Sequence, residues 1–222
     1  MKKSSILSVA GCALALCGCK IDSQYEMFLA DAFEVAGDAG KTAPINGSFR
    51  IEMSSHDKCE SNKARIGEIM SRYFSSLAAL ECQKTGFDDY LTFTAKSFIV
   101  NAKAASLPNN SVTGMAAGLA DGGSVVLYAI IDKNRFAALQ AELNSIESHV
   151  NFEVHDILID INNDGRDTYV VGGASAFVNK EPKLIMDFEI ARREKFEIRL
   201  SDVAVAQLMA SGNSPIFMVK AK

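Results

Sequence analysis

Apolar and polar residues alternate along several stretches of this chain, which is the pattern of strands that bury one face. Phe49, Ile51 and Met53 alternate with Arg50 and Glu52. Four further stretches follow one another in the C-terminal half: Val150–Ile161, Thr168–Val178, Lys183–Ile190 and Lys195–Leu200. Short polar turns separate these stretches, as they do in antiparallel hairpins. The pattern therefore predicts an antiparallel meander over this half of the chain.

One of these stretches changes phase partway along. Its apolar side chains stand at even positions up to Val154 and at odd positions from Ile157 onward. Side chains of a strand alternate between its two faces, so one extra residue is needed to keep both runs on the same face. We therefore predict a β-bulge near His155 and Asp156.

Helical spacing of apolar residues marks the segment from Glu60 to Leu77. Its continuous apolar stripe consists of Ile66, Ile69, Met70, Tyr73, Phe74 and Leu77. This spacing predicts a long amphipathic helix. Shorter helical segments follow Asp31, Asp132 and Asp202, each at a place where a strand candidate ends and a carboxylate can cap the first turn. These three strand–Asp–helix units are either a degenerate repeat or a chance recurrence of a common arrangement.

Together these elements predict an α+β fold. We expect a mostly antiparallel sheet with the C-terminal meander, one long amphipathic helix, and two or three short helices. Residues 25–222 have the length of a single domain of ordinary size. A subdivision near 104–113 is the alternative, because Pro108-Asn109-Asn110 interrupts both kinds of pattern there.

The first 19 residues carry a different pattern, in which two lysines precede a short apolar run and small residues lead to Cys19. Crossing a bilayer takes roughly 20 apolar residues, so the shorter run is typical of a secretory signal peptide. Leu16-Cys17-Gly18-Cys19 resembles the bacterial lipobox. This resemblance implies removal of residues 1–18, a diacylglyceryl thioether on Cys19, and a lipidated tether over residues 19–24. An ordinary secretory signal is the alternative.

Cysteine usage agrees with an oxidising compartment. Cys12 and Cys17 leave with the signal peptide and Cys19 is acylated, so that Cys59 and Cys82 remain. An even pair in a secreted chain is expected to form a disulfide. Two free thiols in a redox or metal site are the alternative, although such sites use closer spacings.

The charge of the chain bears on its partners. The net charge is −4 at pH 7, and it becomes more negative once the two lysines of the signal peptide are removed. An acidic chain without a basic cluster is a poor ligand for nucleic acid or for anionic lipid headgroups. We therefore expect no nucleic-acid partner.

Asp160, Asn162 and Asp164, followed by Gly165, match the first half of a calcium-binding loop. Such a loop needs oxygen donors at positions 1, 3 and 5 and a glycine at position 6. Position 12 is Val171 instead of a bidentate glutamate. A weak calcium site and a metal-free polar hairpin tip both fit these residues. We expect no other metal site, and no cofactor beyond the lipid on Cys19.

Two short motifs suggest hydrolase chemistry. Ser55-His56-Asp57-Lys58 contains triad residue types, and Lys84-Thr85-Gly86 is similar to the third motif of penicillin-recognising enzymes. Triad residues meet through folding and are rarely sequence neighbours, and the middle motif of that enzyme class is absent. Asp57 fits better as the cap of the following helix. We therefore expect no catalytic residues and a protein that is not an enzyme.

The layout as a whole resembles small uncharacterised lipoproteins carried by prophages of Gram-negative bacteria. The resembling parts are Gly18-Cys19-Lys20, Tyr25–Ala36, the Cys59…Glu81-Cys82 pairing, and Asn162–Val178 leading into Phe196–Asp202. The resemblance implies an outer-membrane lipoprotein that faces the periplasm or the cell surface and binds or shields an envelope protein. The alternative is a lipid carrier whose strands and amphipathic helix enclose an apolar channel, which an apolar content of 48% allows.

Overall fold

The computed structural model describes residues 20–104, 106–108, 110–146 and 153–222, so the predicted signal peptide and Cys19 lie outside the described residues. Strands account for 55% and helices for 27% of the described structure. The elements in chain order are β1 (Lys20–Phe28), α1 (Leu29–Gly37), β2 (Thr42–Met53), α2 (His56–Tyr73), β3 (Ser75–Thr85), β4 (Asp88–Asn101), β5 (Thr113–Leu119), the 3₁₀ turn η1 (Asp121–Gly123), β6 (Val125–Ile131), α3 (Lys133–Asn144), β7 (Glu153–Asn162), β8 (Tyr169–Val178), β9 (Glu181–Ile190), β10 (Lys195–Leu200), α4 (Asp202–Ser211) and β11 (Asn213–Ala221).

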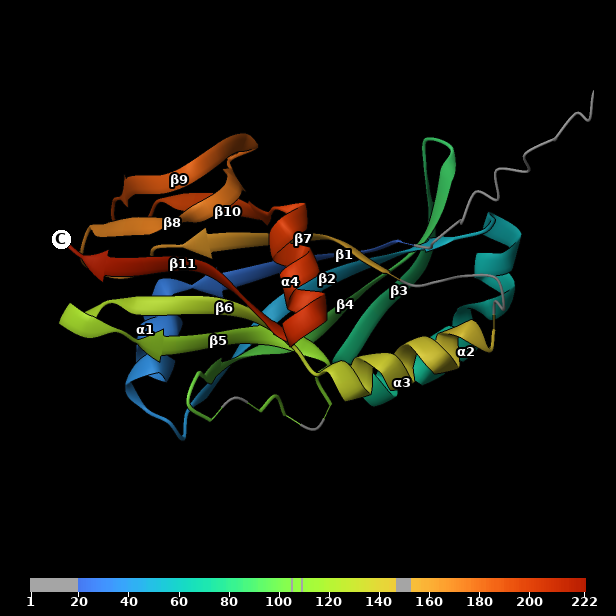
Figure 1. Cartoon of the computed structure of the whole chain (residues 1–222). Helices are drawn as coiled ribbons and strands as arrows, with labels where there is room; N and C mark the ends of the chain where they lie inside the picture. Colours follow the sequence, from blue (N-terminus) through green and yellow to red (C-terminus); the bar gives the residue numbers. More distant parts are fainter. Residues whose placement is uncertain (1–19, 105, 109, 147–152) are drawn as a thin grey trace, which may run out of the picture.

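The strands belong to one sheet, and this sheet closes on itself (Figure 1). Its order is β10-β7-β1-β2-β4-β5-β6-β11-β8-β9, and β10 also pairs with β8, which completes a ring. β9 and β3 lie outside the ring, where they pair with β8 and β4. Neighbouring strands are antiparallel except β1–β7 and β4–β5, which are parallel. The protein is therefore a closed β-barrel with helices packed on it.

The predicted α+β fold is wrong. Strands β7 to β10 occupy the expected C-terminal stretches, but they do not form a meander. Instead β7 pairs with β1 and β10, and among these four strands only β8 and β9 form a hairpin. Alternation identifies a strand but not its partner, and β1 joins β7 between residues as distant as Ser23 and Asp156, 133 positions apart. The glycine-containing strand β5, which alternation does not reveal, is also needed to close the ring.

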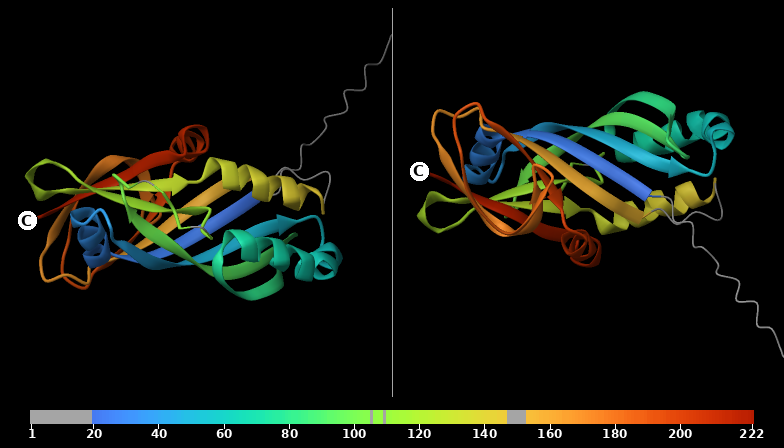
Figure 2. Two further views of the ribbon diagram at one scale, coloured as in Figure 1. Left: turned by 90° about the horizontal axis from the view of Figure 1, so that it is seen from below. Right: turned by 90° about the horizontal axis from the view of Figure 1, so that it is seen from above.

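The segment with helical spacing is displaced from its predicted position. α2 begins at His56, where Ser55 Oγ accepts a hydrogen bond from the backbone N–H of Lys58 at 3.3 Å. It ends at Tyr73, and the expected last turn instead forms the start of β3. α2 lies beside α3 at the end of the barrel opposite the C-terminus (Figures 1 and 2).

The predicted disulfide is confirmed. Cys59 near the start of α2 is bonded to Cys82 of β3, with the two Cα atoms 5.9 Å apart. The bond fixes α2 to a strand whose pairing partner is β4. No helix in the described part of the chain has the length and apolar character needed to cross a membrane.

Residues 20–24 are not a tether, because they form the start of β1 and pair with both β2 and β7. Outward-facing Asp22 and Gln24 alternate with inward-facing Ser23 and Tyr25, a strand pattern that the polar composition conceals. The predicted bulge is confirmed at this pairing. Ile21 pairs with Val154 and Asp22 with Asp156, so that His155 is the extra residue.

The three predicted helix caps have different outcomes. Asp132 accepts a hydrogen bond from the backbone N–H of Arg135 at 3.0 Å and caps α3 as predicted. α4 is capped by Ser201 instead of Asp202, and Asp31 lies inside the first turn of α1. The three strand–helix–strand units also differ in space, because β1 pairs with β2 whereas β6 and β7, or β10 and β11, are not neighbours.

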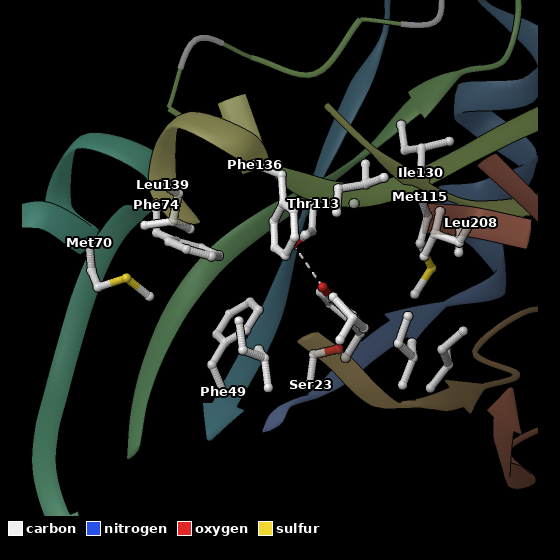
Figure 3. A pocket seen from close by; sticks show the side chains of 18 of the residues that line it. Ser23, Phe49, Met70, Phe74, Thr113, Met115, Ile130, Phe136, Leu139 and Leu208 are labelled. Atoms are coloured by element: carbon white, nitrogen blue, oxygen red, sulfur yellow. Dashed lines mark hydrogen bonds between the residues drawn. The ribbon is translucent and has the colours of Figure 1, made fainter. Parts of the chain in front are cut away.

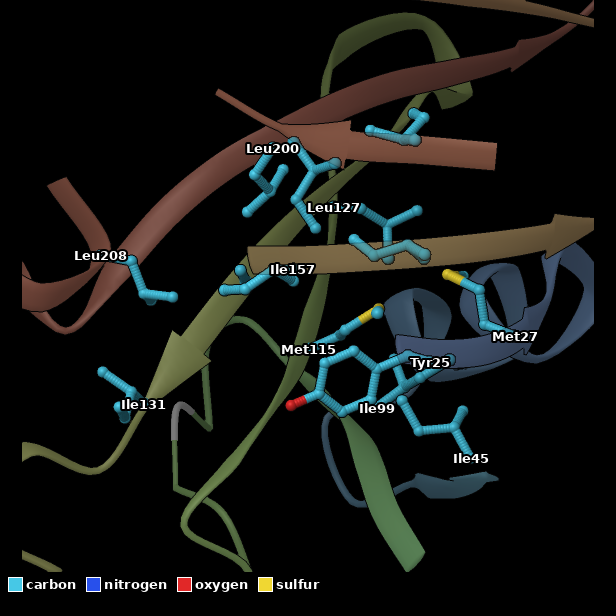
Figure 4. Close-up of a cluster of buried hydrophobic side chains, with 14 of the residues drawn as sticks. Tyr25, Met27, Ile45, Ile99, Met115, Leu127, Ile131, Ile157, Leu200 and Leu208 are labelled. Atoms are coloured by element: carbon cyan, nitrogen blue, oxygen red, sulfur yellow. The ribbon is translucent and has the colours of Figure 1, made fainter. Parts of the chain in front are cut away.

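Apolar side chains from strands all round the ring fill the barrel (Figure 4). Met27 of β1, Leu127 of β6, Ile159 of β7 and Ile198 of β10 are each fully buried. Burying one such side chain contributes about 1.5–3 kcal/mol to stability. The stretch 104–113, where a domain boundary was the alternative, connects β4 to β5, which are neighbours in the same sheet.

Candidate functional site

A small cavity lies inside the barrel, lined by apolar side chains of the sheet and of the helices that cover its end (Figure 3). Tyr25 Oη donates a hydrogen bond to Thr113 Oγ1 at 2.8 Å within it, and burial raises the pKa of the Tyr25 phenol. The cavity volume is about 30 Å³, the space of about one water molecule. Sites for small molecules occupy roughly 300–1,000 Å³. The interior is therefore a packed core.

A larger concavity of about 490 Å³ lies on the outer wall of the barrel, where β3 bends over the outward faces of β4, β2 and β1. The bend arises within β3 itself. Its register against β4 shifts twice between Ser75 and Glu81, and Ser76 and Ala79 have positive φ angles of 54° and 52°. Such bulges increase the twist of a strand and turn it away from its neighbour. We call this concavity the β3 groove.

The floor of the β3 groove follows directly from strand register. On β1, β2 and β4 the odd-numbered side chains point into the barrel, so the even-numbered ones face the groove. One row of directly paired residues crosses five strands, and its members are Glu81, Thr92, Arg50, Asp22 and Asp156. Gln83 and Gln24 also line the groove. Phe49, Phe93 and Leu158 line the groove as well, so its surface is a mixture of polar and apolar side chains on paired strands.

Arg50 and Asp22 form the central ion pair of the groove. The Arg50 Nε and Nη2 atoms donate to Asp22 Oδ2 at 3.0 and 2.6 Å, and the guanidinium lies 4.5 Å from the centre of the Tyr90 ring. The hydrogen bond to Asp22 raises the pKa of Arg50. His155 Nδ1, displaced by the bulge, lies 3.3 Å from Asp22 Oδ1. Arg50 is therefore held by neighbours within the groove.

The remaining carboxylates of the groove are those of Asp156 and Glu81. Asp156 accepts a hydrogen bond from Arg199 Nε at 2.8 Å, and Glu81 accepts one from Gln83 Nε2 at 3.3 Å. The lining contains three carboxylates and Arg50, but Asp22 is paired with Arg50 and Asp156 with Arg199, which leaves Glu81 as the carboxylate bonded by a neutral amide. Such a surface can accept hydrogen bonds from a cationic or amide-rich ligand.

The three calcium-loop candidates form hydrogen bonds with three different residues of β1 and α1. Asp160 accepts a hydrogen bond from Gln24 Nε2 at 2.6 Å. Asn162 Nδ2 donates to Glu26 Oε1 at 3.3 Å, and Asp164 Oδ1 accepts from the backbone N–H of Ala30 at 3.1 Å in the first turn of α1. Within the described ranges, no three His, Cys, Asp or Glu side chains are placed to hold a metal ion.

The two hydrolase-like motifs are also structural. Ser55 is the cap of α2, in the role that the sequence suggested for Asp57. Lys84-Thr85-Gly86 ends β3 at the turn into β4, and His56 Nδ1 lies 3.8 Å from Asp89 Oδ1 beside this turn. Ser55 therefore has a backbone partner instead of a neighbouring general base.

A family model for a domain of unknown function, DUF7424, matches residues 33–222. The match begins within α1 and runs to the C-terminus, so it covers every strand of the barrel except β1. A comparison with curated proteins finds no match. The extent of the family match shows that the chain belongs to the DUF7424 family.

Proposed function

We propose that this protein is a lipid-anchored lipoprotein of the bacterial outer membrane that binds an envelope protein partner through the β3 groove. The support for this placement is the position of β1. Its first residue, Lys20, directly follows the lipobox cysteine, and consecutive Cα atoms are about 3.8 Å apart. A lipid on Cys19 would therefore hold Asp22, on the floor of the groove, within about 10 Å of the anchored residue.

The chemistry of the groove favours a basic segment of a protein as the ligand. Its carboxylates are fixed on neighbouring strands, where little conformational entropy is lost on binding. Opposite charge on the partner would guide the encounter and fix its register. A prophage protein that shields a receptor and a host protein that engages an assembly partner would both use such a contact.

A lipid carrier is not the function that we propose. The apolar cavity of about 30 Å³ is roughly a tenth of the smallest usual ligand site. An acyl chain would have to displace core side chains such as Phe49 and Phe74, which are buried against each other and against Phe93.

Photocrosslinking in living cells tests the proposal. A photoreactive residue at Gln83 or Thr94, both exposed within the groove, is expected to give one reproducible crosslinked species in the outer membrane. The same residue at Ile185, which is exposed on β9 away from the groove, is expected to give none.

Charge reversal supplies the matched control for this experiment. Glu81→Lys is expected to reduce the crosslinked species about tenfold, the effect of 1.4 kcal/mol. Asp187→Lys on the outer face of β9 makes the same charge change and is expected to leave it unaltered. Equal crosslinking from Ile185, or equal losses in the two lysine variants, would contradict the groove as the binding site.

A further inference from the structure

The turn between β3 and β4 carries an apolar side chain that nothing in the described structure covers. Phe87 is 101% exposed, more than any other large apolar side chain among the described residues. It follows Gly86, whose φ of +66° forms the turn, and Thr85 pairs with Asp88 across the hairpin. Aromatic side chains usually bury a large area on folding. This one is held away from the barrel by two paired strands.

The Phe87 hairpin projects at the end of the barrel where β1 begins (Figure 1). Ile21, Ile51, Leu91 and Cys82 are directly paired in one row across β1, β2, β4 and β3. Phe87 lies four residues beyond Leu91, about 13 Å along the strand. Cys19 is two residues before Ile21 in the chain, so the Cα atoms of these two residues are at most about 7 Å apart. Two residues therefore cannot carry Cys19 as far along this direction as the hairpin tip.

We propose that Phe87 inserts into the interfacial layer of the membrane that holds the lipid of Cys19. This inference rests on the proposed lipid anchor and adds a second contact to it. Two contacts would fix the orientation of the barrel, and the β3 groove, which is walled by the same hairpin, would then lie along the membrane surface. We infer that the tip contacts the bilayer itself, because the short distance between Lys20 and the lipid keeps the hairpin close to the membrane surface.

The charges beside the tip indicate which bilayer surface it prefers. Asp88 and Asp89 follow Phe87 directly, and Lys84 precedes the turn. Two carboxylates against one ammonium disfavour a strongly anionic surface. Zwitterionic headgroups would therefore accept the tip more readily than an anionic layer.

Tryptophan fluorescence tests this insertion, because the native chain contains no tryptophan. The lipidated Phe87→Trp protein is placed in zwitterionic vesicles that carry brominated lipids. We expect a blue-shifted emission and at least a twofold quenching by bromines near the headgroups. The matched control, Ile185→Trp on β9, is expected to show neither change.

A second form of the Phe87→Trp protein separates this inference from the anchor itself. In the mature chain Cys19 is the thiol that remains outside the Cys59–Cys82 disulfide, so a synthetic diacyl group can be coupled to it. Quenching of the introduced indole in this form supports insertion even if native Cys19 is found without lipid, a result that would remove only the proposed function. An unshifted and unquenched indole in the synthetically anchored protein would overturn the insertion. A shift that required a membrane protein and was insensitive to brominated lipid would overturn it too.

Discussion

Replacing both Cys59 and Cys82 with alanine is expected to lower the free energy of unfolding by about 3 kcal/mol. The bond closes a loop between residues that are 23 positions apart, and without it the unfolded chain gains the corresponding conformational entropy. The loss should appear locally as well, because the bond fixes β3 and α2 to each other. Urea unfolding of the mature protein, followed by circular dichroism, measures the effect.

The same experiment includes its own comparison. Wild-type protein unfolded in the presence of a reductant should match the double variant, since both lack the cross-link. Cys59 is fully buried, so the reductant should act slowly on the folded protein. A double variant within about 1 kcal/mol of the oxidised wild type would show that the bond does not constrain the fold.

Asn163→Ala is expected to destabilise the protein by roughly 3 kcal/mol, because it removes a buried amide that bonds four buried or partly buried backbone groups. The Asn163 side chain is 1% exposed. Its Nδ2 atom donates to the carbonyl oxygens of Asp167, Ile190 and Ala191 at 3.0 to 3.2 Å, and its Oδ1 accepts from the N–H of Gly165 at 3.1 Å. One side chain thus joins the β7–β8 connection to the turn after β9.

Asn179→Ala is the matched control for this substitution. Asn179 also bonds the backbone through its side chain, accepting from the N–H of Glu197 at 2.9 Å, but it does so at an exposed turn where water can replace it. Losing this bond is expected to cost less than about 1 kcal/mol. Alanine at the Asn179 φ of 49° adds about 1 kcal/mol of strain, so the total stays below the loss for Asn163→Ala. Equal losses for the two variants would contradict a structural role for the buried amide.

The local elements of this fold are readable from the sequence to a large extent. Residues close in sequence are enough to predict the C-terminal strands, the bulge at His155 and the cap at Asp132. The number of remaining cysteines is enough to predict the disulfide. The closure of the barrel cannot be predicted from such local signals. Its closure depends on β10 pairing with β8, on parallel pairing of β1 with β7, and on the glycine-containing strand β5. The alternating pattern within one strand does not determine which other strand it pairs with.

The β3 groove was missed for a related reason. Nothing in the sequence around Asp22 or Arg50 indicates that strand register places them opposite each other. Interpreting residues 19–24 as a tether also concealed the strand pattern at Asp22 and Gln24. The motifs that do stand out, Asp160-Ile161-Asn162-Asn163-Asp164-Gly165 and Ser55-His56-Asp57-Lys58, contribute hydrogen bonds and a helix cap to the fold.

Intact-mass analysis of the native protein purified from membranes tests the anchor on which the proposed function is built. We expect a chain that begins at residue 19 and carries a thioether-linked diacylglycerol on Cys19, usually with a further acyl chain on its amino group. Digestion should leave this added mass on the peptide that contains Lys20. A native protein with an unmodified Cys19, or with residues 1–18 still attached, would show that the proposed lipid anchor is wrong.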